Sequence, residues 1–327
     1  MSDVVTFGEA MIRLSPPNYR RIEQTNLLDV NIGGAELNVA VALSRLGLKV
    51  SWVSRLTDNP LGAMIRNKAR EQGVDTSNIV WTKDGRVGLY FLELGASPRA
   101  SKIVYDRAGS AISQIKPGEI DWDKVLSGVK WFHTSGITPA LSVSAAQVTA
   151  DALKAAKKAG CKVSYDLNYR SKLWTEEQAR QCQEPFMEYI DVLISTEEDI
   201  GKVLGVGREN YREVAKMLAG KFKFEVVCIT LREDLSVLKN RWTAIAYANG
   251  KVYDDRVYDV EIIDRLGAGD SFSAGFIYGY LTGEVEKGVK YGNAYSALKH
   301  SMPGDFNWAT KAEIEEQIKG AGTRISR

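Results

Sequence analysis

The chain has 327 residues, with 43 Lys and Arg against 41 Asp and Glu. This length allows a large buried core without disulfide bonds, and the even charge balance offers no basic surface for nucleic acid. Charged residues make up 26% and hydrophobic residues 44% of the chain, values that exclude extensive disorder.

Short apolar runs alternate with segments of helical periodicity along most of the chain. Strands are expected, in chain order, at residues 4–7, 50–54, 131–134, 162–166, 192–195, 226–230 and 257–263. Helices are expected at residues 37–46, 143–159, 176–189, 268–281 and 287–300. This alternation predicts an α/β fold with a mainly parallel central sheet.

Two regions break the alternation, at about residues 11–31 and 86–106, where apolar residues recur with period two. A turn with the sequence GASP at 95–98 would join two of these strands as a hairpin. We expect a small antiparallel sheet that projects from the α/β body and acts as a lid. The chain is therefore predicted to be a single domain, residues 1–327, with the lid inserted in it.

Histidine and cysteine are scarce. The histidines are His133 and His300, both in segments typical of the protein interior, which disfavours a Ser–His–Asp or Cys–His mechanism. Cys161, Cys182 and Cys228 lie too far apart in sequence for a zinc or iron–sulfur motif. An odd number of thiols, no signal peptide pattern and no run of roughly 20 apolar residues indicate a cytoplasmic protein without membrane contact.

The segment 264–272 reads DRLGAGDSF and links an expected strand to an expected helix. Gly267, Ala268 and Gly269 would bring the free N–H groups of the helix start together as an anion-binding turn. Asp270 lies where a carboxylate could orient an incoming hydroxyl group and accept its proton. Phosphoryl transfer requires mainly such positioning and charge neutralisation. An ordinary helix cap explains the same residues without catalysis.

A second glycine motif, GGAELN at 33–38, opens the first long helix. The backbone amides of Gly33 and Gly34 could meet sugar hydroxyl groups, and Asn38 adds a side-chain amide. Paired glycines before a helix are equally compatible with a simple helix start.

Taken together, these motifs resemble the two signatures of the ribokinase/PfkB carbohydrate kinase family. The same order of motifs includes VTFGE at 5–9, DLNYR at 166–170 and PGDF at 303–306, so the resemblance covers essentially the whole chain. It implies a ribokinase-like three-layer α/β/α domain with a β lid, a sugar kinase that uses ATP and Mg²⁺, and Asp270 as the catalytic base.

Within that family the chain is most similar to the 2-keto-3-deoxygluconate kinases, through GEAMIRL at 8–14, YDR at 105–107 and GDFN at 304–307. The acidic sugar would need cations, and arginine binds carboxylates through paired hydrogen bonds. The implied substrate-binding residues are Gly33, Gly34, Asn38, Tyr90, Tyr105, Arg107, Arg170 and Asp305. The alternative to substrate binding is that these arginines form ordinary surface salt bridges and that these tyrosines are present because tyrosine favours strands.

The resemblance also places ATP on the α/β body. The implied contacts are Asn168, Arg170, Ser195, Thr230, Gly267, Gly269 and Asn293. Ser195 replaces the asparagine of the family's Asn-x-x-Glu segment, in which Glu198 would organise Mg²⁺ through water. A serine cap followed by first-turn acids explains this segment equally well. The expected turn after Thr230 reads LREDLS instead of a glycine-rich sequence, which leaves the nucleotide preference open.

Other functions remain open at this point. A fructokinase- or ribokinase-like kinase of a neutral sugar keeps the fold and changes the substrate, whereas a sugar or nucleotide sensor would need no catalytic base. A nicotinamide oxidoreductase is disfavoured because no GxGxxG motif follows the first strand. Because an exposed lid sheet has unpaired edges, we expect a homodimer or higher homo-oligomer formed through the lid.

Overall fold

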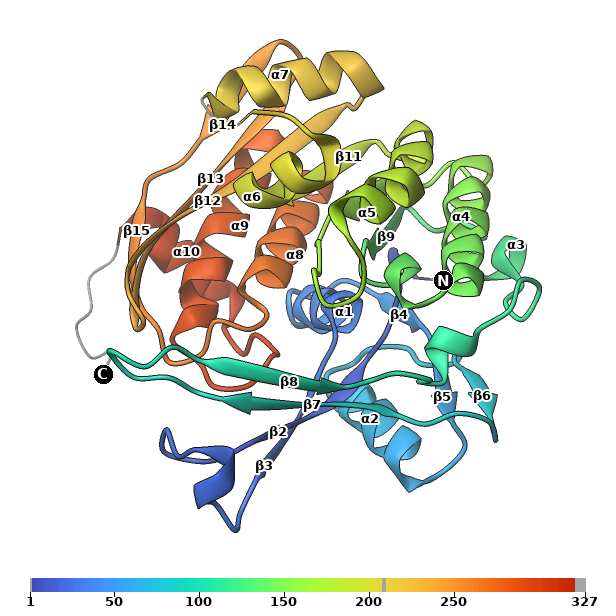
Figure 1. Cartoon of the computed structure of the whole chain (residues 1–327). Coiled ribbons are helices and arrows are strands. Elements are labelled where there is room, and N and C mark those ends of the chain that lie inside the picture. The colour runs from blue at the N-terminus through green and yellow to red at the C-terminus, as the bar shows by residue number, and fades with distance from the viewer. Residues whose placement is uncertain (1, 208–209, 321–327) are drawn as a thin grey trace.

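A computed structural model describes residues 2–207 and 210–320 of the chain. Figure 1 shows a body of helices around a large sheet, with a small sheet projecting from one side of it. In the described part of the chain the large sheet has nine strands. They are β1 (Val4–Phe7), β4 (Val50–Val53), β9 (Trp131–Ser135), β10 (Lys162–Asp166), β11 (Val192–Thr196), β12 (Val226–Ser236), β13 (Lys239–Ala248), β14 (Lys251–Asp254) and β15 (Tyr258–Glu261).

The strands of the large sheet follow the order β14-β13-β12-β11-β10-β9-β1-β4, and β15 also pairs with β13. Pairing is parallel from β4 to β12 and antiparallel where β13 joins β12, β14 and β15. The central strands are rich in Val, Ile and Phe and are buried along almost their whole length, as expected for parallel strands covered on both faces. The predicted mainly parallel sheet is confirmed.

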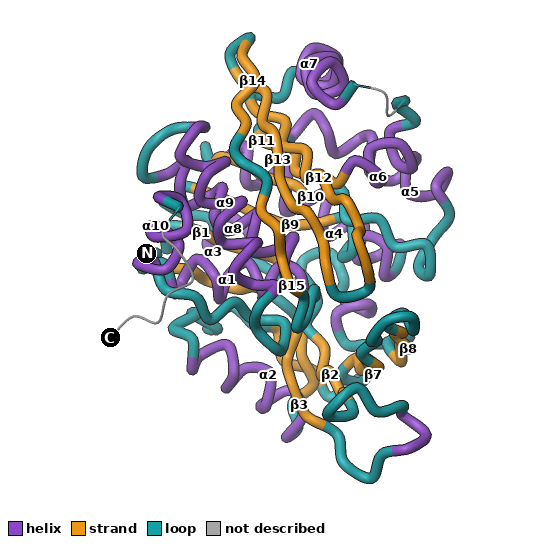
Figure 2. The backbone as a smooth tube through the Cα atoms, turned by 90° about the vertical axis from the view of Figure 1, so that its left-hand side faces the viewer, coloured by secondary structure: helices purple, strands orange, loops and turns teal. Residues whose placement is uncertain are grey.

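Helices cover both faces of the sheet, which makes three layers (Figure 2). The longer helices are α1 (Ala35–Arg45), α2 (Pro60–Glu71), α4 (Val143–Lys158), α5 (Glu176–Gln183), α7 (Tyr211–Phe222), α8 (Ala268–Leu281), α9 (Val285–His300) and α10 (Lys311–Lys319), and the short ones are α3 (Trp122–Val125) and α6 (Glu197–Asp199). None of the helices in the described ranges is long and apolar enough to cross a membrane.

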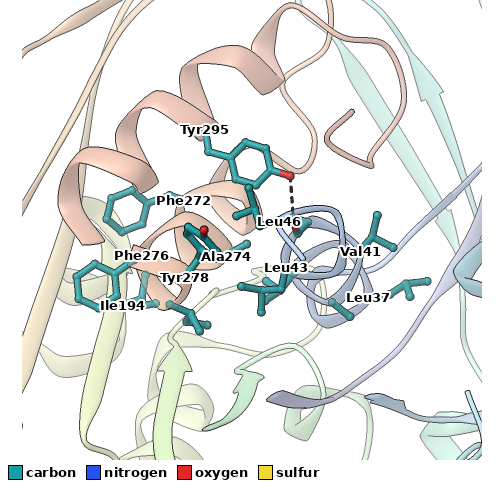
Figure 3. Packing of buried hydrophobic residues seen from close by; sticks show 14 of the residues in the cluster. Leu37, Val41, Leu43, Leu46, Ile194, Phe272, Ala274, Phe276, Tyr278 and Tyr295 are labelled. Atoms are coloured by element: carbon teal, nitrogen blue, oxygen red, sulfur yellow. Dashed lines mark hydrogen bonds between the residues drawn. The ribbon is translucent and has the colours of Figure 1, made fainter. Parts of the chain in front are cut away.

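The core beneath α8 and α9 fixes the start of α8, where the glycine motif lies. Phe272 and Phe276 of α8 are fully buried, and the Tyr295 hydroxyl of α9 donates to the Ala42 carbonyl of α1 at 3.2 Å (Figure 3). A methyl group on Gly275 would approach the backbone of α9 to 2.6 Å, so this glycine allows the two helices to pack closely. The helix start is therefore held by three packed helices.

The lid is a four-stranded sheet of β2 (Met11–Ser15), β3 (Asp29–Gly33), β7 (Gly88–Glu93) and β8 (Lys102–Asp106), in the order β3-β2-β7-β8. Its location agrees with the sequence, but the prediction of a purely antiparallel sheet is wrong, because β2 and β7 pair in parallel. The chain between these two strands crosses the body through α1, β4 and α2, and a crossover of this length brings both strands back in the same direction.

The remaining differences concern the ends of predicted elements and elements that were not predicted. The expected helix at 176–189 is α5 followed by a 3₁₀ helix at Glu184–Tyr189, which has a proline in its first turn. The expected turn directly after Thr230 is wrong, because β12 continues to Ser236 while it pairs with β13. Helices α2 and α7, strands β13 and β14, and a two-stranded sheet of β5 (Arg55–Thr57) and β6 (Val80–Thr82) were not foreseen.

Candidate functional site

The glycine motif forms the turn that starts α8. Gly267 is the N-cap residue at φ 82°, and a side chain there would collide with the Asp305 carbonyl oxygen. A methyl group on Gly269 would meet no atom within 4 Å. The first-turn N–H groups of a helix have no helical acceptor, and the space beside Gly269 leaves room for an anion next to them. The turn therefore fits a phosphoryl group.

Asp270 and Asn38 bring the two glycine motifs together. The Asn38 side-chain amide, in the first turn of α1, donates to Asp270 Oδ2 at 2.7 Å. Burial raises the pKa of Asp270 from 3.8 to about 6, against the lowering effects of the Asn38 hydrogen bond and the Arg170 charge. Asp270 is thus ionised at neutral pH and is a stronger base than an ordinary aspartate.

The paired glycines before α1 allow close approach of three chain segments. A side chain on Gly33 would collide with the Asp305 carboxylate, and one on Gly34 would collide with the Glu9 carbonyl oxygen. Close packing accounts for both glycines in this structure. Their contact with a sugar stays a prediction.

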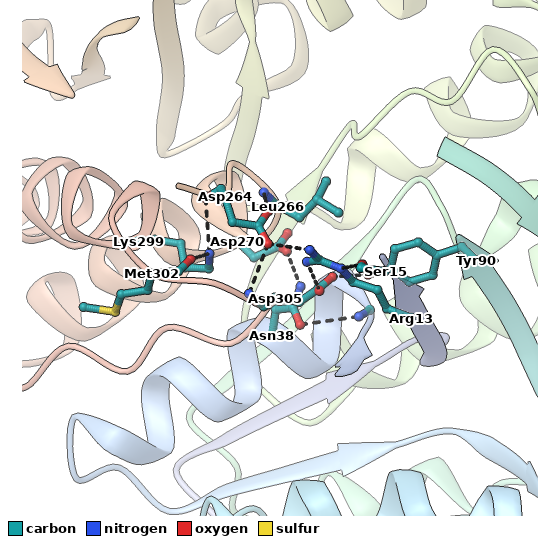
Figure 4. Close-up of polar contacts among 12 residues, drawn as sticks. Arg13, Ser15, Asn38, Tyr90, Asp264, Leu266, Asp270, Lys299, Met302 and Asp305 are labelled. Atoms are coloured by element: carbon teal, nitrogen blue, oxygen red, sulfur yellow. Dashed lines mark hydrogen bonds and ion pairs between the residues drawn. The ribbon is translucent and has the colours of Figure 1, made fainter. Parts of the chain in front are cut away.

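A buried ion-pair cluster joins the lid to the body (Figure 4). Arg13 of β2, only 2% exposed, forms salt bridges to Asp264 at 2.6 Å and to Asp305 at 2.8 Å. The Tyr90 hydroxyl of β7 donates to Asp305, and the Gly304 amide donates to Asp264 at 3.0 Å. Tyr90 and Asp305, both predicted to contact substrate, therefore also connect lid and body.

Sequence reasoning missed Arg13 as a site residue, although a charged residue within an apolar strand segment was a usable signal. It also missed Glu36, whose Oε1 accepts hydrogen bonds from the amide and hydroxyl of Ser135, at 3.0 and 2.7 Å, and from the Thr138 hydroxyl at 3.2 Å. Burial raises the pKa of Glu36 to about 7, so its proton affinity is unusually high for a glutamate.

A cavity of about 930 Å³ lies between the lid strand β8 and the segment after β10. Among the described residues its lining has five cationic side chains, Lys102, Arg107, Arg170, Lys172 and Lys202, and one carboxylate, Asp106. Asp106 already pairs with Arg86 at 2.5 Å outside the lining. Arg107 and Lys202 pair in the same way, with Glu9 and Glu198. The positive charge of Lys102, Arg170 and Lys172 remains and favours an anionic occupant.

The predicted residues Tyr105, Arg107 and Arg170 all line this cavity. Arg107 forms a buried ion pair with Glu9, and its guanidinium lies 5.4 Å from the centre of the Tyr105 ring. The Lys172 ammonium lies 5.6 Å from the same ring. Two cations therefore lie within 6 Å of the Tyr105 ring centre beside the cavity.

Arg170 lines the cavity and also acts electrostatically on Asp270. Its charge lowers the pKa values of Asp166, Asp199 and Asp270, in each case against the larger effect of burial, which raises them. Asp166 and Asp199 were not foreseen as part of the site. Asp270 itself is not part of the cavity lining, so Arg170 is the electrostatic link between the two.

Three of the predicted nucleotide residues lie near the carboxyl ends of β10 and β11: Asn168, Ser195 and Thr230, the last of which pairs with Thr196 from within the longer strand β12. The Thr230 hydroxyl donates to the Ser195 carbonyl at 3.4 Å, and Asn168 follows β10 with a left-handed φ of 39°. Asn293 of α9 is fully buried and its Oδ1 has no hydrogen-bond partner among the described residues. Ligands of open α/β sheets bind at this edge. ATP contact with these residues stays a prediction.

Glu198 lies in α6 and pairs with Lys202 at 3.1 Å. Within residues 2–207 and 210–320, no three His, Cys, Asp or Glu side chains are grouped to hold a metal ion. The donor set thus does not form a protein cage, and Mg²⁺ here would need phosphate and water as its main ligands, which is common for this ion.

Comparison with known proteins gives consistent matches over the whole chain. Residues 1–310 match the profile of the pfkB family carbohydrate kinases. The chain is 40% identical over 327 residues to a 2-dehydro-3-deoxygalactonokinase of Haloferax volcanii, covering 100% of this chain and 99% of that one. It is 32% identical over 325 residues to a 5-dehydro-2-deoxygluconokinase of Shouchella clausii, covering 96% of each.

The fold is similarly close to a solved structure. A crystal structure of 2-dehydro-3-deoxygluconokinase from Thermotoga maritima superimposes with a TM-score of 0.95 and 48% sequence identity, covering 98% of this chain and 100% of that one. The similarity includes both the α/β body and the lid, since nearly the full length of each chain is matched.

Proposed function

Because the chain belongs to the pfkB family of carbohydrate kinases, we propose that it transfers the terminal phosphoryl group of ATP to the 6-hydroxyl group of 2-keto-3-deoxygluconate. The observation that carries this substrate class is the cavity, in which the charges of Lys102, Arg170 and Lys172 remain after the salt-bridged Arg107, Lys202 and Asp106 are set aside. A sugar acid supplies the carboxylate that such a cavity favours. The galactonate epimer has the same charge and is the nearest alternative, named by the Haloferax relative.

Asp270 is the proposed catalytic base. Asn38 occupies Oδ2, so the proton of the sugar hydroxyl group would pass to Oδ1. As the hydroxyl oxygen forms its bond to the γ-phosphorus, the bond from that phosphorus to the bridging oxygen breaks and ADP leaves. The raised pKa of Asp270 brings its basicity closer to that required at neutral pH.

The turn of Gly267, Ala268 and Gly269 is proposed to bind the charge that develops on the transferred phosphoryl group, through backbone N–H groups at the start of α8. Bound Mg²⁺ would supply further neutralisation of the phosphate charge. Asn168, Ser195, Thr230 and Asn293 are proposed to contact ATP from the strand ends, with Glu198 acting toward Mg²⁺ through water.

The sugar acid is proposed to lie between the body and the lid. Arg107, Arg170 and Tyr105 would contact it from the cavity lining. Gly33, Gly34, Asn38, Tyr90 and Asp305 would complete the substrate side, which lies next to the buried lid junction. Closure of the lid would exclude water and limit wasteful hydrolysis of ATP.

The remaining parts of the proposal concern the whole molecule. The chain acts as one kinase domain, residues 1–327, in a reducing cytoplasmic compartment, in keeping with the free thiols Cys161, Cys182 and Cys228. A homodimer or higher homo-oligomer through the lid is supported by the exposed apolar side chains Val30 and Val104 on its two edge strands.

The test is ADP release with ATP, Mg²⁺ and each of four acceptors: the gluconate and galactonate keto-deoxy acids, fructose and ribose. We expect activity with an acidic sugar, phosphorylated at the 6-position, and a loss of about 1,000-fold or more in Asp270→Asn. The matched control is Asp123→Asn, because Asp123 is an exposed carboxylate that pairs with Lys158 outside the site.

Three outcomes would overturn parts of the proposal. A preference for fructose or ribose would assign the neutral-sugar kinase instead. The absence of sugar-dependent ADP with every acceptor and divalent metal would exclude the kinase activity. Unchanged activity of Asp270→Asn would remove Asp270 as the base.

A further inference from the structure

Lys299, in the last turn of α9, is a lysine with 0% of its surface exposed. Its ammonium donates to the carbonyl oxygen of Met302 at 3.0 Å and to that of Asp264 at 3.4 Å (Figure 4). Lysine is rarely buried to this degree, because an ammonium group loses its hydration. The position therefore calls for a reason beyond packing.

The two carbonyl groups belong to the two segments that form the anion-binding turn. Asp264 precedes this turn, and Met302 precedes Asp305, whose carbonyl oxygen lies against Gly267. A methyl group on Gly267 would approach Lys299 Cε to 3.4 Å. The lysine stem thus packs beneath the glycine turn and its ammonium ties the neighbouring segments together.

The charges around Lys299 come from several elements. Asp264 and Asp305 face it from the two tied segments, Asp270 from α8 and Arg13 from the lid. Burial lowers the pKa of Lys299, while the carboxylates oppose that effect. The charge of Lys299 also lowers the pKa of its neighbour His300, on which burial has the larger lowering effect.

The carboxylates of Asp264 and Asp305 already have a partner in the Arg13 guanidinium. Lys299 instead bonds to backbone carbonyl groups, so neutralising a carboxylate does not explain it. A fixed ammonium under a helix start would add positive potential where a phosphoryl group lies. It also contributes to lowering the pKa of Asp270.

We propose that Lys299 is a positioning residue for phosphoryl transfer: its ammonium holds the Asp264 and Met302 carbonyl groups, fixes the turn at 267–270 and supplies a positive charge beneath it. The inference rests on the proposed kinase function for its activity readout. It assigns Lys299 an electrostatic role that reaches the reaction through the turn, without contact with substrate.

The experiment compares Lys299→Ala and Lys299→Met with the wild-type enzyme. We expect kcat to fall about 100-fold in both variants, while KM for the sugar changes less than about threefold, because the lost stabilisation belongs to the transition state. The acid limb of the kcat profile should move to higher pH, since a cation that lowers the Asp270 pKa is gone.

Chemical rescue separates this role from a structural one. Truncation in Lys299→Ala leaves a carbonyl-lined space, and ammonium or methylammonium chloride should restore kcat about tenfold in a saturable way, against sodium chloride at equal ionic strength. Lys299→Met fills that space and should not respond. Lys290→Ala removes an exposed cation from the same helix and is the matched control.

The inference would be overturned if Lys299→Met kept the kcat of the wild-type enzyme. It would also be overturned if the acid limb of the kcat profile did not move and ammonium did not rescue Lys299→Ala. A loss of thermal stability that ammonium restores without restoring kcat would also overturn the inference.

If the wild-type enzyme has no kinase activity, the proposed function fails, and Lys299 is then tested by calorimetric binding of a non-hydrolysable ATP analogue in place of kcat. About tenfold weaker binding in Lys299→Ala, restored by ammonium, would then support Lys299; equal binding would overturn it.

Discussion

Two buried carboxylates lie on either side of the Gly267 turn, Asp270 and Asp305, and they differ in their partners. Asp305 pairs with the Arg13 guanidinium and accepts a hydrogen bond from Tyr90. Asp270 has the uncharged Asn38 amide as its close partner and senses Arg170 as a charge. Burial raises the pKa of both carboxyl groups; the largest opposing effect is the Arg13 charge at Asp305 and the Asn38 hydrogen bond at Asp270. Partner identity thus distinguishes the anchoring carboxylate, Asp305, from the proposed reactive one, Asp270.

The largest expected effect concerns the anchoring side. In Arg13→Met, Asp264 and Asp305 lose their shared cation while they stay buried, and the free energy of unfolding should fall by about 3–5 kcal/mol. Urea unfolding followed by circular dichroism measures it. The matched control is Arg86→Met. Arg86 is 41% exposed and pairs with Asp106 at the lid edge, so the free energy of unfolding of this variant should fall by no more than about 1 kcal/mol.

A second variant tests whether the unpaired carboxylates cause the loss of stability in Arg13→Met. Adding Asp264→Asn and Asp305→Asn to Arg13→Met removes the unpaired charges and should recover part of the lost stability. Equal stability of Arg13→Met and the wild-type protein would mean that this cluster does not anchor the lid.

A smaller effect is expected in substrate preference. Arg107 pairs with Glu9, whereas Arg170 faces several carboxylates and lines the same cavity. Arg107→Ala should lower kcat/KM for the acidic sugar about tenfold more than for a neutral sugar, because it removes a hydrogen-bonding cation from a carboxylate. Initial rates with both sugars measure this ratio, and an unchanged ratio would contradict the carboxylate contact.

Arg170→Met sharpens that comparison, because Arg170 also lowers the pKa of Asp270. Its removal should decrease activity with both classes of sugar, in contrast to the selective effect of Arg107→Ala. A variant of an exposed arginine outside the cavity lining, Arg212→Ala, is expected to leave the preference unchanged.

The smallest effect concerns the pH dependence of the reactive side. Asp270 must be ionised to accept a proton, so kcat/KM should fall tenfold per pH unit below its pKa of about 6. Asn38→Ala removes a hydrogen bond that lowers this pKa, so the acid limb should move to higher pH. A pH–rate profile from pH about 5 to 8 checks the direction; a limb that moves downward would contradict the assignment.

Much of the fold was predictable because its signals are local. Strands β1, β10 and helix α8 match their predicted ranges, since buried apolar runs and a glycine helix start depend on nearby residues. The lid was located from its period-two pattern. Its parallel β2–β7 pair was not, because two strands separated by a crossover through the body carry no local signal of their pairing.

The site divides in the same way. Asp270 and the glycines of both motifs lie at helix starts, as predicted, because helix starts and tight turns demand these residue types at fixed positions; their roles stay predictions. Arg13, Glu36 and Lys299 were missed. Arg13 and Asp305 are 292 positions apart in the chain, and the partner of a buried charge is chosen only when distant segments pack.

The sequence by itself determined the alternation of most strands and helices, the glycine turn at the start of α8 and the proposal of a carboxylate as base, because each depends on local backbone geometry and residue type. Only the tertiary structure decided which charges are paired and which face the cavity. Electrostatic energies depend on distance and burial in three dimensions, so Arg107 beside Glu9 and Lys299 beneath the turn could be recognised only once the chain was folded.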